Sequence, residues 1–280
     1  MSNPKRSFII SGGGALGISA IGAFKALLDS EMAHIITETK HFVGCSIGSI
    51  LALMLALKLP LKIIEEELVN GFDGKKICAP IRLDSLLSDY GICDGSGIVE
   101  YVVEILRHAD MPDETTLGDI LARTGNNLCI STICVETGIE YFDSVTTPNL
   151  PVTTAIRMST AIPIFYSAVK HNGKHYIDAA TNENPLPVAA PGVSDYYGIQ
   201  FIHKSKSPMK IVSLQTFILA MSKLNTKKHV NQINRTRVIE LKIPIHPLTV
   251  DLPLDIKKKI IKLGEIQTRN WTKLRLKKND

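Results

Sequence analysis

Ser46 is the residue of this chain best placed to act as a nucleophile, because it stands at the centre of Gly44-Cys45-Ser46-Ile47-Gly48. Residues 41–43 could end a buried strand, and residues 49–57 are rich in strong helix formers. Between a strand and a helix, Gly-x-Ser-x-Gly forms a nucleophile elbow, whose glycines avoid collisions with neighbouring backbone. The hydroxyl then lies at the helix N-terminus, where the dipole favours negative charge. We therefore expect Ser46 as nucleophile and Gly44 and Gly48 as elbow glycines, with Cys45 a small residue facing the core rather than a reactive thiol.

Three successive glycines, Gly12, Gly13 and Gly14, follow a strand-like run over residues 6–11 and precede a helical pattern. Their unobstructed N–H groups suit a phosphate or the oxyanion of a tetrahedral acyl intermediate. The spacing also satisfies Gly-x-Gly-x-x-Gly, but a dinucleotide site needs an acidic residue about 20 positions later, at the end of a second strand. Glu31 and Glu38 end no convincing apolar strand, and no Gly-Lys-Ser/Thr follows the loop. We therefore expect an oxyanion hole rather than a nucleotide site or a merely structural glycine turn.

Asp178 ends the second of two strand-like runs, residues 164–170 and 175–177, which flank the turn pair Asn172-Gly173. A serine hydroxyl becomes a good nucleophile when a neighbouring base takes its proton. An aspartate at a strand end beside the elbow can do this directly. The sequence therefore predicts a Ser46–Asp178 dyad.

Other residues compete for the role of base. Asp94-Gly95-Ser96-Gly97 precedes a helical pattern, so helix capping explains it more simply. A Ser-His-Asp triad would need His171 or His175, but both precede Asp178, whereas α/β-hydrolases place the histidine after the acid. The later histidines fit no better, because His203 stands in a Lys-rich loop and His246 between prolines. We expect His171 and His175 on a surface hairpin.

The elements that position these residues alternate between strand and helix patterns, as in an α/β fold. Residues 61–70, 98–108 and 116–123 have helical periodicity, and the nearly continuous apolar run 128–135 predicts a buried parallel strand. A strand over 238–243 and a helix through Ile256, Ile260, Leu263 and Ile266 follow.

The glycine loop, the elbow and the late aspartate, in that order, resemble the patatin-like phospholipase family, as do residues 155–163 and the pair Asn184-Pro185. The resemblance covers residues 6–190. It implies a three-layer α/β/α fold with a central, mostly parallel sheet. It also implies metal- and cofactor-independent hydrolysis of fatty-acyl esters, with glycerophospholipids as expected substrates. Ser46 would be the nucleophile, Asp178 the base, and Gly12, Gly13 and Gly14 the oxyanion donors.

Two departures from the family pattern bear on activity. Asp178 is followed by Ala179 and Ala180, where the family usually has Gly-Gly or Gly-Ala; if that position needs a positive φ, Ala179 is strained by about 1 kcal/mol. Leu16 stands where the family's loop often has Arg or Lys. A catalytically inactive lipid- or partner-binding protein is therefore the alternative. A neutral-lipid hydrolase or transacylase stays open within the same chemistry, and an oxidoreductase is a more distant hypothesis.

Composition indicates a globular protein of a reducing compartment. The chain has 280 residues, of which 45% are hydrophobic, and its five cysteines form no Cys-x-x-Cys pair. The apolar run after Lys5-Arg6 is too short for a secretory segment, and that of 47–59 too short for a membrane span. We expect a cytoplasmic protein without a zinc site, with a core of residues 6–190 and an extension, 191–280, packed on the same domain.

Positive charge is concentrated at the C-terminal end. Residues 201–280 hold 18 of the 32 Lys and Arg residues but 5 of the 27 acidic ones. Lys257, Lys258, Lys259 and Lys262 lie largely off the predicted apolar stripe of the last helix, so this face could dock on anionic lipid as a peripheral contact. A solvated helix face is the simpler interpretation, and docking on lipid is the alternative to it. Nucleic acid is not expected, since aromatics are sparse here and no groove-reading motif is present.

Overall fold

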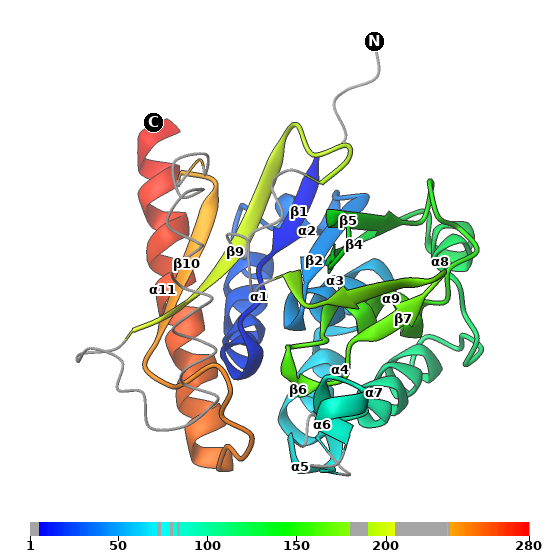
Figure 1. Cartoon of the computed structure of the whole chain (residues 1–280). Coiled ribbons are helices and arrows are strands. Elements are labelled where there is room, and N and C mark those ends of the chain that lie inside the picture. The colour runs from blue at the N-terminus through cyan, green and yellow to red at the C-terminus, as the bar shows by residue number, and fades with distance from the viewer. Residues whose placement is uncertain are drawn as a thin grey trace.

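The computed structural model describes residues 6–71, 74–78, 81–82, 85–179, 190–204, 234 and 236–279. Within these residues, eight strands form one sheet in the order β10-β9-β1-β2-β4-β8-β7, with β5 also paired to β4 (Figure 1). Its strands are β1 (Ser7–Ile10), β2 (His41–Cys45), β4 (Asn127–Cys134), β5 (Gly138–Asp143), β7 (Val169–His171), β8 (Lys174–Ile177), β9 (Tyr196–His203) and β10 (Val238–Ile243). A second pair, β3 (Gly91–Cys93) and β6 (Ile164–Tyr166), lies beside it.

The sheet is mostly parallel, as predicted. Strands β10, β9, β1, β2 and β4 are parallel neighbours, and every residue of β1 and β2 is buried, as expected for strands covered on both faces. The prediction for residues 128–135 was only partly right. Strand β4 is parallel to β2 but antiparallel to β5 and β8. The pairing with β5 is antiparallel because the chain turns back at once through Gly138, and Val135 lies beyond the strand and is exposed.

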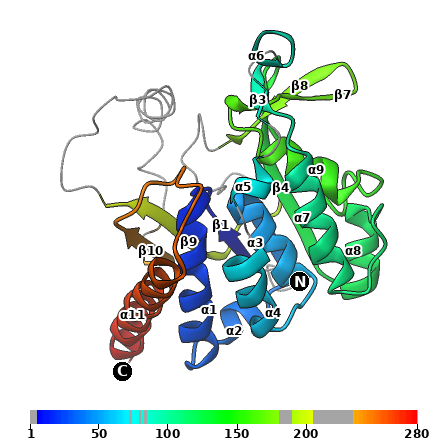
Figure 2. The same cartoon turned by 90° about the horizontal axis from the view of Figure 1, so that it is seen from below.

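The helices provide the other layers of the fold, and several of them cover one face of the sheet (Figures 1 and 2). They are the 3-10 helix η1 (Gly14–Ser19), α1 (Ala20–Leu28), α2 (His34–Thr37), α3 (Ile47–Ala56), α4 (Leu61–Glu66), the π-helix η2 (Glu67–Gly71), α5 (Gly74–Ile77), α6 (Ser85–Ser88), α7 (Ser96–Arg107), α8 (Leu117–Thr124), α9 (Val152–Ser159) and α11 (Leu254–Asn279). Alternate residues of β1 separate the two faces: Phe8 and Ile10 join the main core, whereas Ile9 packs with Val43 and Ala190. The predicted α/β class, with helices flanking a central sheet, is confirmed.

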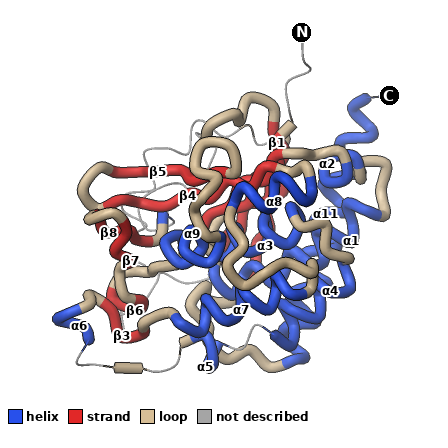
Figure 3. Tube along the Cα trace, turned by 90° about the vertical axis from the view of Figure 1, so that its right-hand side faces the viewer, coloured by secondary structure: helices blue, strands red, loops and turns tan. Residues whose placement is uncertain are grey.

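The predicted strand 164–170 is divided between two sheets. Its first part, β6, pairs with β3 close to α5, α6 and α7 (Figure 3), whereas its second part, β7, pairs with β8. Asn172 and Gly173 both have positive φ, 49° and 78°, as a tight hairpin turn requires. The hairpin prediction is therefore confirmed, and the hairpin ends just before Asp178.

Residues 191–280 contribute β9 and β10 to the main sheet and pack α11 against α1 and β10. The helix packs through glycines: a Cβ on Gly264 would overlap the Ser19 carbonyl, and one on Gly22 would overlap the Ile261 carbonyl. Three residues of the predicted stripe lie on the packed face: Ile260 is buried, and Ile256 and Leu263 pack against the main core. Ile266, expected inside, is 45% exposed, while the buried positions include Ile260, Ile261, Thr268 and Trp271.

Three of the four lysines expected to contact anionic lipid are already bonded within the protein. Lys257 Nζ donates to the Val69 carbonyl at 2.6 Å, and Lys259 and Lys262 pair with Asp255 and Glu265. His203, expected in a loop, lies at the end of β9. Among the residues that the structure describes, no helix is long and apolar enough to cross a membrane.

Candidate active site

Ser46 lies at the sharp junction between β2 and α3 and is 5% exposed. Its backbone has φ 54° and ψ −129°, a conformation that non-glycine residues seldom adopt. The turn is closed by close backbone approaches. A Cβ on Gly44 would overlap the Gly48 carbonyl, and one on Gly48 would overlap the carbonyls of Ile10 and Ser11. The two glycines thus stand where the predicted elbow requires them.

A hydrogen-bonded serine pair holds this strained turn, and the sequence patterns did not reveal it. The Ser46 amide donates to Ser159 Oγ at 2.9 Å, and Ser159 Oγ donates to the Ser131 carbonyl at 2.7 Å. Ser159 ends α9 and is fully buried, while Ser131 lies on β4 beside Cys45. We call these two hydrogen bonds of Ser159 the latch. They connect the elbow to the neighbouring strand through a residue more than a hundred positions away.

The glycine loop lies beside the elbow, between β1 and η1. Gly14, with φ 52°, lines the same cavity as Ser46, and a Cβ on it would overlap the Pro247 carbonyl. That carbonyl accepts a hydrogen bond from the Ala15 amide at 2.8 Å. Leu16 is buried in the main core, so this position makes no anion contact.

Asp178 follows β8 directly and is 1% exposed. Its amide donates to the Ala161 carbonyl at 3.0 Å, and its Oδ1 lies 3.7 Å from Cys45 Sγ. The structure therefore brings Asp178 against the residue next to Ser46. Cys45 is buried against Ile133 and Ala179, in agreement with the interpretation of a small residue facing inward.

The strain expected at Ala179 does not arise, because Ala179 is not among the residues with positive φ and is itself buried. The departure from the family's Asp-Gly pattern is therefore accommodated by the local backbone. Ala180, Asn184 and Pro185 lie outside the described residues.

The other candidate bases, Asp94, His171 and His175, make hydrogen bonds to other residues. The Asp94 carboxylate accepts hydrogen bonds from the amide and the hydroxyl of Ser96, both at 2.8 Å, at the start of α7. The bond from the Ser96 amide lowers the pKa of Asp94. His175 Nδ1 lies 2.8 Å from Glu136 Oε1, and His171 Nε2 lies 3.2 Å from Asn172, both on the hairpin surface. These positions match the predicted capping and hairpin roles.

Arg157 is a buried cation close to the site that sequence reasoning missed. Its Nε and Nη2 donate to the Asp94 carbonyl at 3.1 and 2.7 Å, and Nη2 also donates to the Ser167 carbonyl at 2.8 Å. The guanidinium lies over the Tyr166 ring at 5.5 Å, and burial lowers its pKa. Gly95, with φ 78°, leaves the space that this guanidinium occupies. Arg157 thereby joins α9 to the small sheet that forms one side of the cavity.

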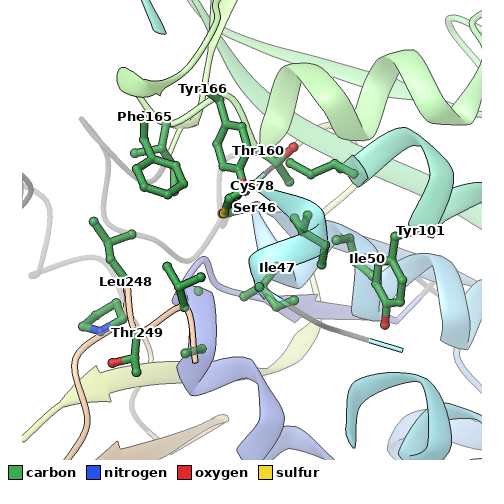
Figure 4. A pocket seen from close by; sticks show the side chains of 18 residues that line it. Ser46, Ile47, Ile50, Cys78, Tyr101, Thr160, Phe165, Tyr166, Leu248 and Thr249 are labelled. Carbon is green, nitrogen blue, oxygen red and sulfur yellow. Dashed lines mark hydrogen bonds between the residues drawn. The ribbon is translucent and has the colours of Figure 1, made fainter. Parts of the chain in front are cut away.

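The Ser46 cavity is largely apolar (Figure 4). Its lining side chains include Ile47, Ile50, Ile77, Ile98, Ile162 and Phe165. Three polar side chains of the wall bond within the protein. Tyr166 OH lies 3.2 Å from Cys78 Sγ, Thr160 Oγ1 donates to the Ile156 carbonyl, and Thr249 Oγ1 donates to the His246 carbonyl. The wall therefore offers mostly hydrocarbon around the Ser46 hydroxyl.

The chain is similar to known proteins in sequence. The model of the patatin-like phospholipase family matches residues 8–190. The uncharacterized protein R571 of Acanthamoeba polyphaga mimivirus is 24% identical over 282 residues, 91% of this chain and 88% of that protein. The probable lipid hydrolase 463L of Invertebrate iridescent virus 6 is 25% identical over 194 residues, 66% of this chain and 63% of its own length.

Solved structures share the fold. VipD from Legionella pneumophila superposes with a TM-score of 0.63 at 15% identity, covering 97% of this chain and 67% of VipD. ExoU from the type III secretion system of Pseudomonas aeruginosa, solved with SpcU, superposes with a TM-score of 0.54 at 17% identity. That superposition covers 98% of this chain but 53% of ExoU, so this chain spans about half of that protein.

Proposed function

Because this chain belongs to the patatin-like phospholipase family, we propose that it is a serine-dependent lipid acyl hydrolase that cleaves fatty-acyl esters of glycerophospholipids. The viral relative named a probable lipid hydrolase supports the same general activity. The observation that carries the proposal is the strained, buried Ser46 elbow in an apolar cavity, with the Asp178 carboxylate against the adjacent Cys45.

In the proposed reaction, Ser46 Oγ attacks the ester carbonyl carbon while Asp178 accepts the hydroxyl proton. The tetrahedral intermediate collapses to an acyl-serine, and the departing alcohol takes the proton from Asp178. A water molecule then attacks the acyl-serine carbonyl carbon while Asp178 accepts its proton. Collapse of this second intermediate releases the fatty acid, and Asp178 returns the proton to Ser46 Oγ.

Backbone amides of the glycine loop would stabilise the oxyanion, with Gly12, Gly13 and Gly14 as the candidate donors. Ala15 is not a donor in this arrangement, because its amide is bonded to the Pro247 carbonyl. The start of α3 lies at Ser46 and adds the positive end of a helix dipole.

Fluorophosphonate labelling tests the dyad. The wild type should be labelled at Ser46, Ser46→Ala should not be labelled, and Asp178→Asn should be labelled at least about 100-fold more slowly, which is a typical effect of losing a general base. His175→Ala is the matched control, since its ring faces Glu136 on the surface, and it should be labelled like the wild type.

Phospholipid hydrolysis should be equal in the wild type and His175→Ala, much slower in Asp178→Asn and absent in Ser46→Ala. The activity of the wild type should persist in EDTA. Thermal unfolding of each variant separates loss of the dyad from loss of the fold. If folded Ser46→Ala retains hydrolysis, the proposal is wrong. If the folded wild type is neither labelled nor active, the inactive lipid-binding alternative replaces it.

A further inference from the structure

One wall of the Ser46 cavity comes from outside the family match. The match ends at residue 190, yet the cavity is also lined by Pro247, Leu248, Thr249 and Val250, between β10 and α11. We call residues 246–250 the C-terminal wall. The C-terminal wall therefore belongs to the extension and not to the matched core.

The C-terminal wall is fixed at both of its ends. At one end, the Pro247 carbonyl accepts the Ala15 amide at 2.8 Å and lies where a Cβ on Gly14 would be. At the other, the Val250 carbonyl lies where a Cβ on Gly74 would be, at the start of α5. Between them, Thr249 closes a turn, its amide donating to the His246 carbonyl at 3.1 Å. Such a segment keeps a defined shape beside the glycine loop.

Leu248 differs from its neighbours in the wall. Val250 packs against the main hydrophobic core, whereas Leu248 is half-buried and, among the described residues, is not one of those packed against that core. It lines the cavity together with Phe165 of β6, and Figure 4 labels both side chains. A change at Leu248 should therefore alter the cavity more than the fold.

We propose that the C-terminal wall sets which acyl chains the cavity accepts, with Leu248 as the specificity-determining residue. This inference rests on the proposed function, since it names the substrate group that the cavity holds. The wall hydroxyls of Tyr166, Thr160 and Thr249 are bonded within the protein, so the surface left for a ligand is mostly hydrocarbon. The ligand group of matching chemistry is the fatty-acyl chain of the ester that Ser46 attacks.

The size of the effect follows from hydrocarbon burial. Each methylene kept out of an apolar site lowers affinity about fourfold. Leu248→Trp, which adds bulk to the wall, should exclude two or more methylenes of a long chain. It should therefore lower the ratio of kcat/KM for p-nitrophenyl laurate to that for p-nitrophenyl butyrate at least about tenfold. Leu248→Ala should raise the ratio a few-fold.

Leu254→Trp is the matched control, because it makes the same substitution at a leucine of the same region that is 52% exposed. Its ratio should equal that of the wild type. The selectivity proposal is refuted if the laurate-to-butyrate ratio of folded Leu248→Trp, like that of Leu254→Trp, stays within about twofold of the wild-type ratio.

A binding experiment separates this inference from the proposed chemistry. In a Ser46→Ala background, cis-parinaric acid should bind, and Leu248→Trp should weaken its binding about tenfold or more while Leu254→Trp should not. If ester hydrolysis survives Ser46→Ala, the proposed function fails, and the binding comparison still decides the role of Leu248. If cis-parinaric acid binds equally well to both tryptophan variants, the cavity wall does not select acyl chains.

Discussion

The Ser159 latch provides a sharp test of how the elbow is held. In Ser159→Ala, the Ser46 amide loses its acceptor and the Ser131 carbonyl loses a donor. Ser159, Ser131 and Ser46 are all buried, so water cannot readily replace the missing hydroxyl. The variant removes one oxygen atom and introduces no new group.

The expected loss can be worked out from these two bonds. An intramolecular hydrogen bond contributes about 1 kcal/mol net, and a buried polar group left without a partner costs about 1–3 kcal/mol. The loss falls mainly on the Ser46 amide, so we expect the free energy of unfolding to decrease by about 2–4 kcal/mol. In a chain of this size, that corresponds to a fall in Tm of about 3–7 °C.

The same change should slow the chemistry. With its amide released, Ser46 loses one of the contacts that hold its φ at 54°, and a displacement of about 1 Å can cost about 100-fold in rate. Fluorophosphonate labelling of the folded variant should therefore be about 10- to 100-fold slower. Urea unfolding and labelling kinetics measure the two effects separately.

Ser7→Ala is the matched control. Ser7 is also fully buried, and its hydroxyl bonds to His41 Nδ1 at 2.9 Å, at the opposite end of the β1–β2 pair from Ser46. It should lose about 1–3 kcal/mol of stability without slower labelling. If folded Ser159→Ala is labelled at the wild-type rate, as Ser7→Ala should be, the Ser159 hydrogen bond does not hold the elbow.

Two further predictions concern the backbone and the surface. Gly48→Ala should abolish soluble folded protein or destabilise it severely, because its Cβ would overlap two carbonyls. Gly138→Ala has open space around the new Cβ and should cost about 1–3 kcal/mol, from its φ of 99° alone. Equal stabilities of the two variants by thermal unfolding would contradict this reasoning. Several hydrogen bonds, the largest of them from the His175 side chain, lower the pKa of Glu136 to about 2. This contact therefore stabilises the fold at pH values above the ordinary carboxylate pKa, and the stabilisation is lost as the pH falls toward 2. In His175→Ala, NMR titration should find the Glu136 pKa raised toward its ordinary value, and an unchanged pKa would argue against the contact.

Local patterns predicted the elements around the site well. The Asn172-Gly173 hairpin and the strand–turn–helix at Ser46 each depend on a few adjacent residues. Their φ requirements and backbone clearances are encoded in glycine and asparagine at particular positions. The assignment of Ser46, Asp178 and the three glycines to catalysis stays a prediction until the labelling experiment is done.

Periodicity was less informative for the C-terminal helix. It predicted the existence of α11 but assigned Ile266 to the buried face, because the face is chosen by the glycine crossing with α1 rather than by apolar residues alone. Gly22 and Gly264 are separated by most of the chain, and nothing near either of them indicates the other.

The sequence by itself determined the elbow, the glycine loop, the hairpin before Asp178 and the family to which the chain belongs. Only the tertiary structure decided that Ser159 binds the Ser46 amide, that Arg157 supports the cavity and that Pro247 bonds to the glycine loop. The reason is physical. Turn and helix signals arise from interactions among neighbouring residues. These contacts form between segments far apart in the chain, so no local sequence pattern predicts them.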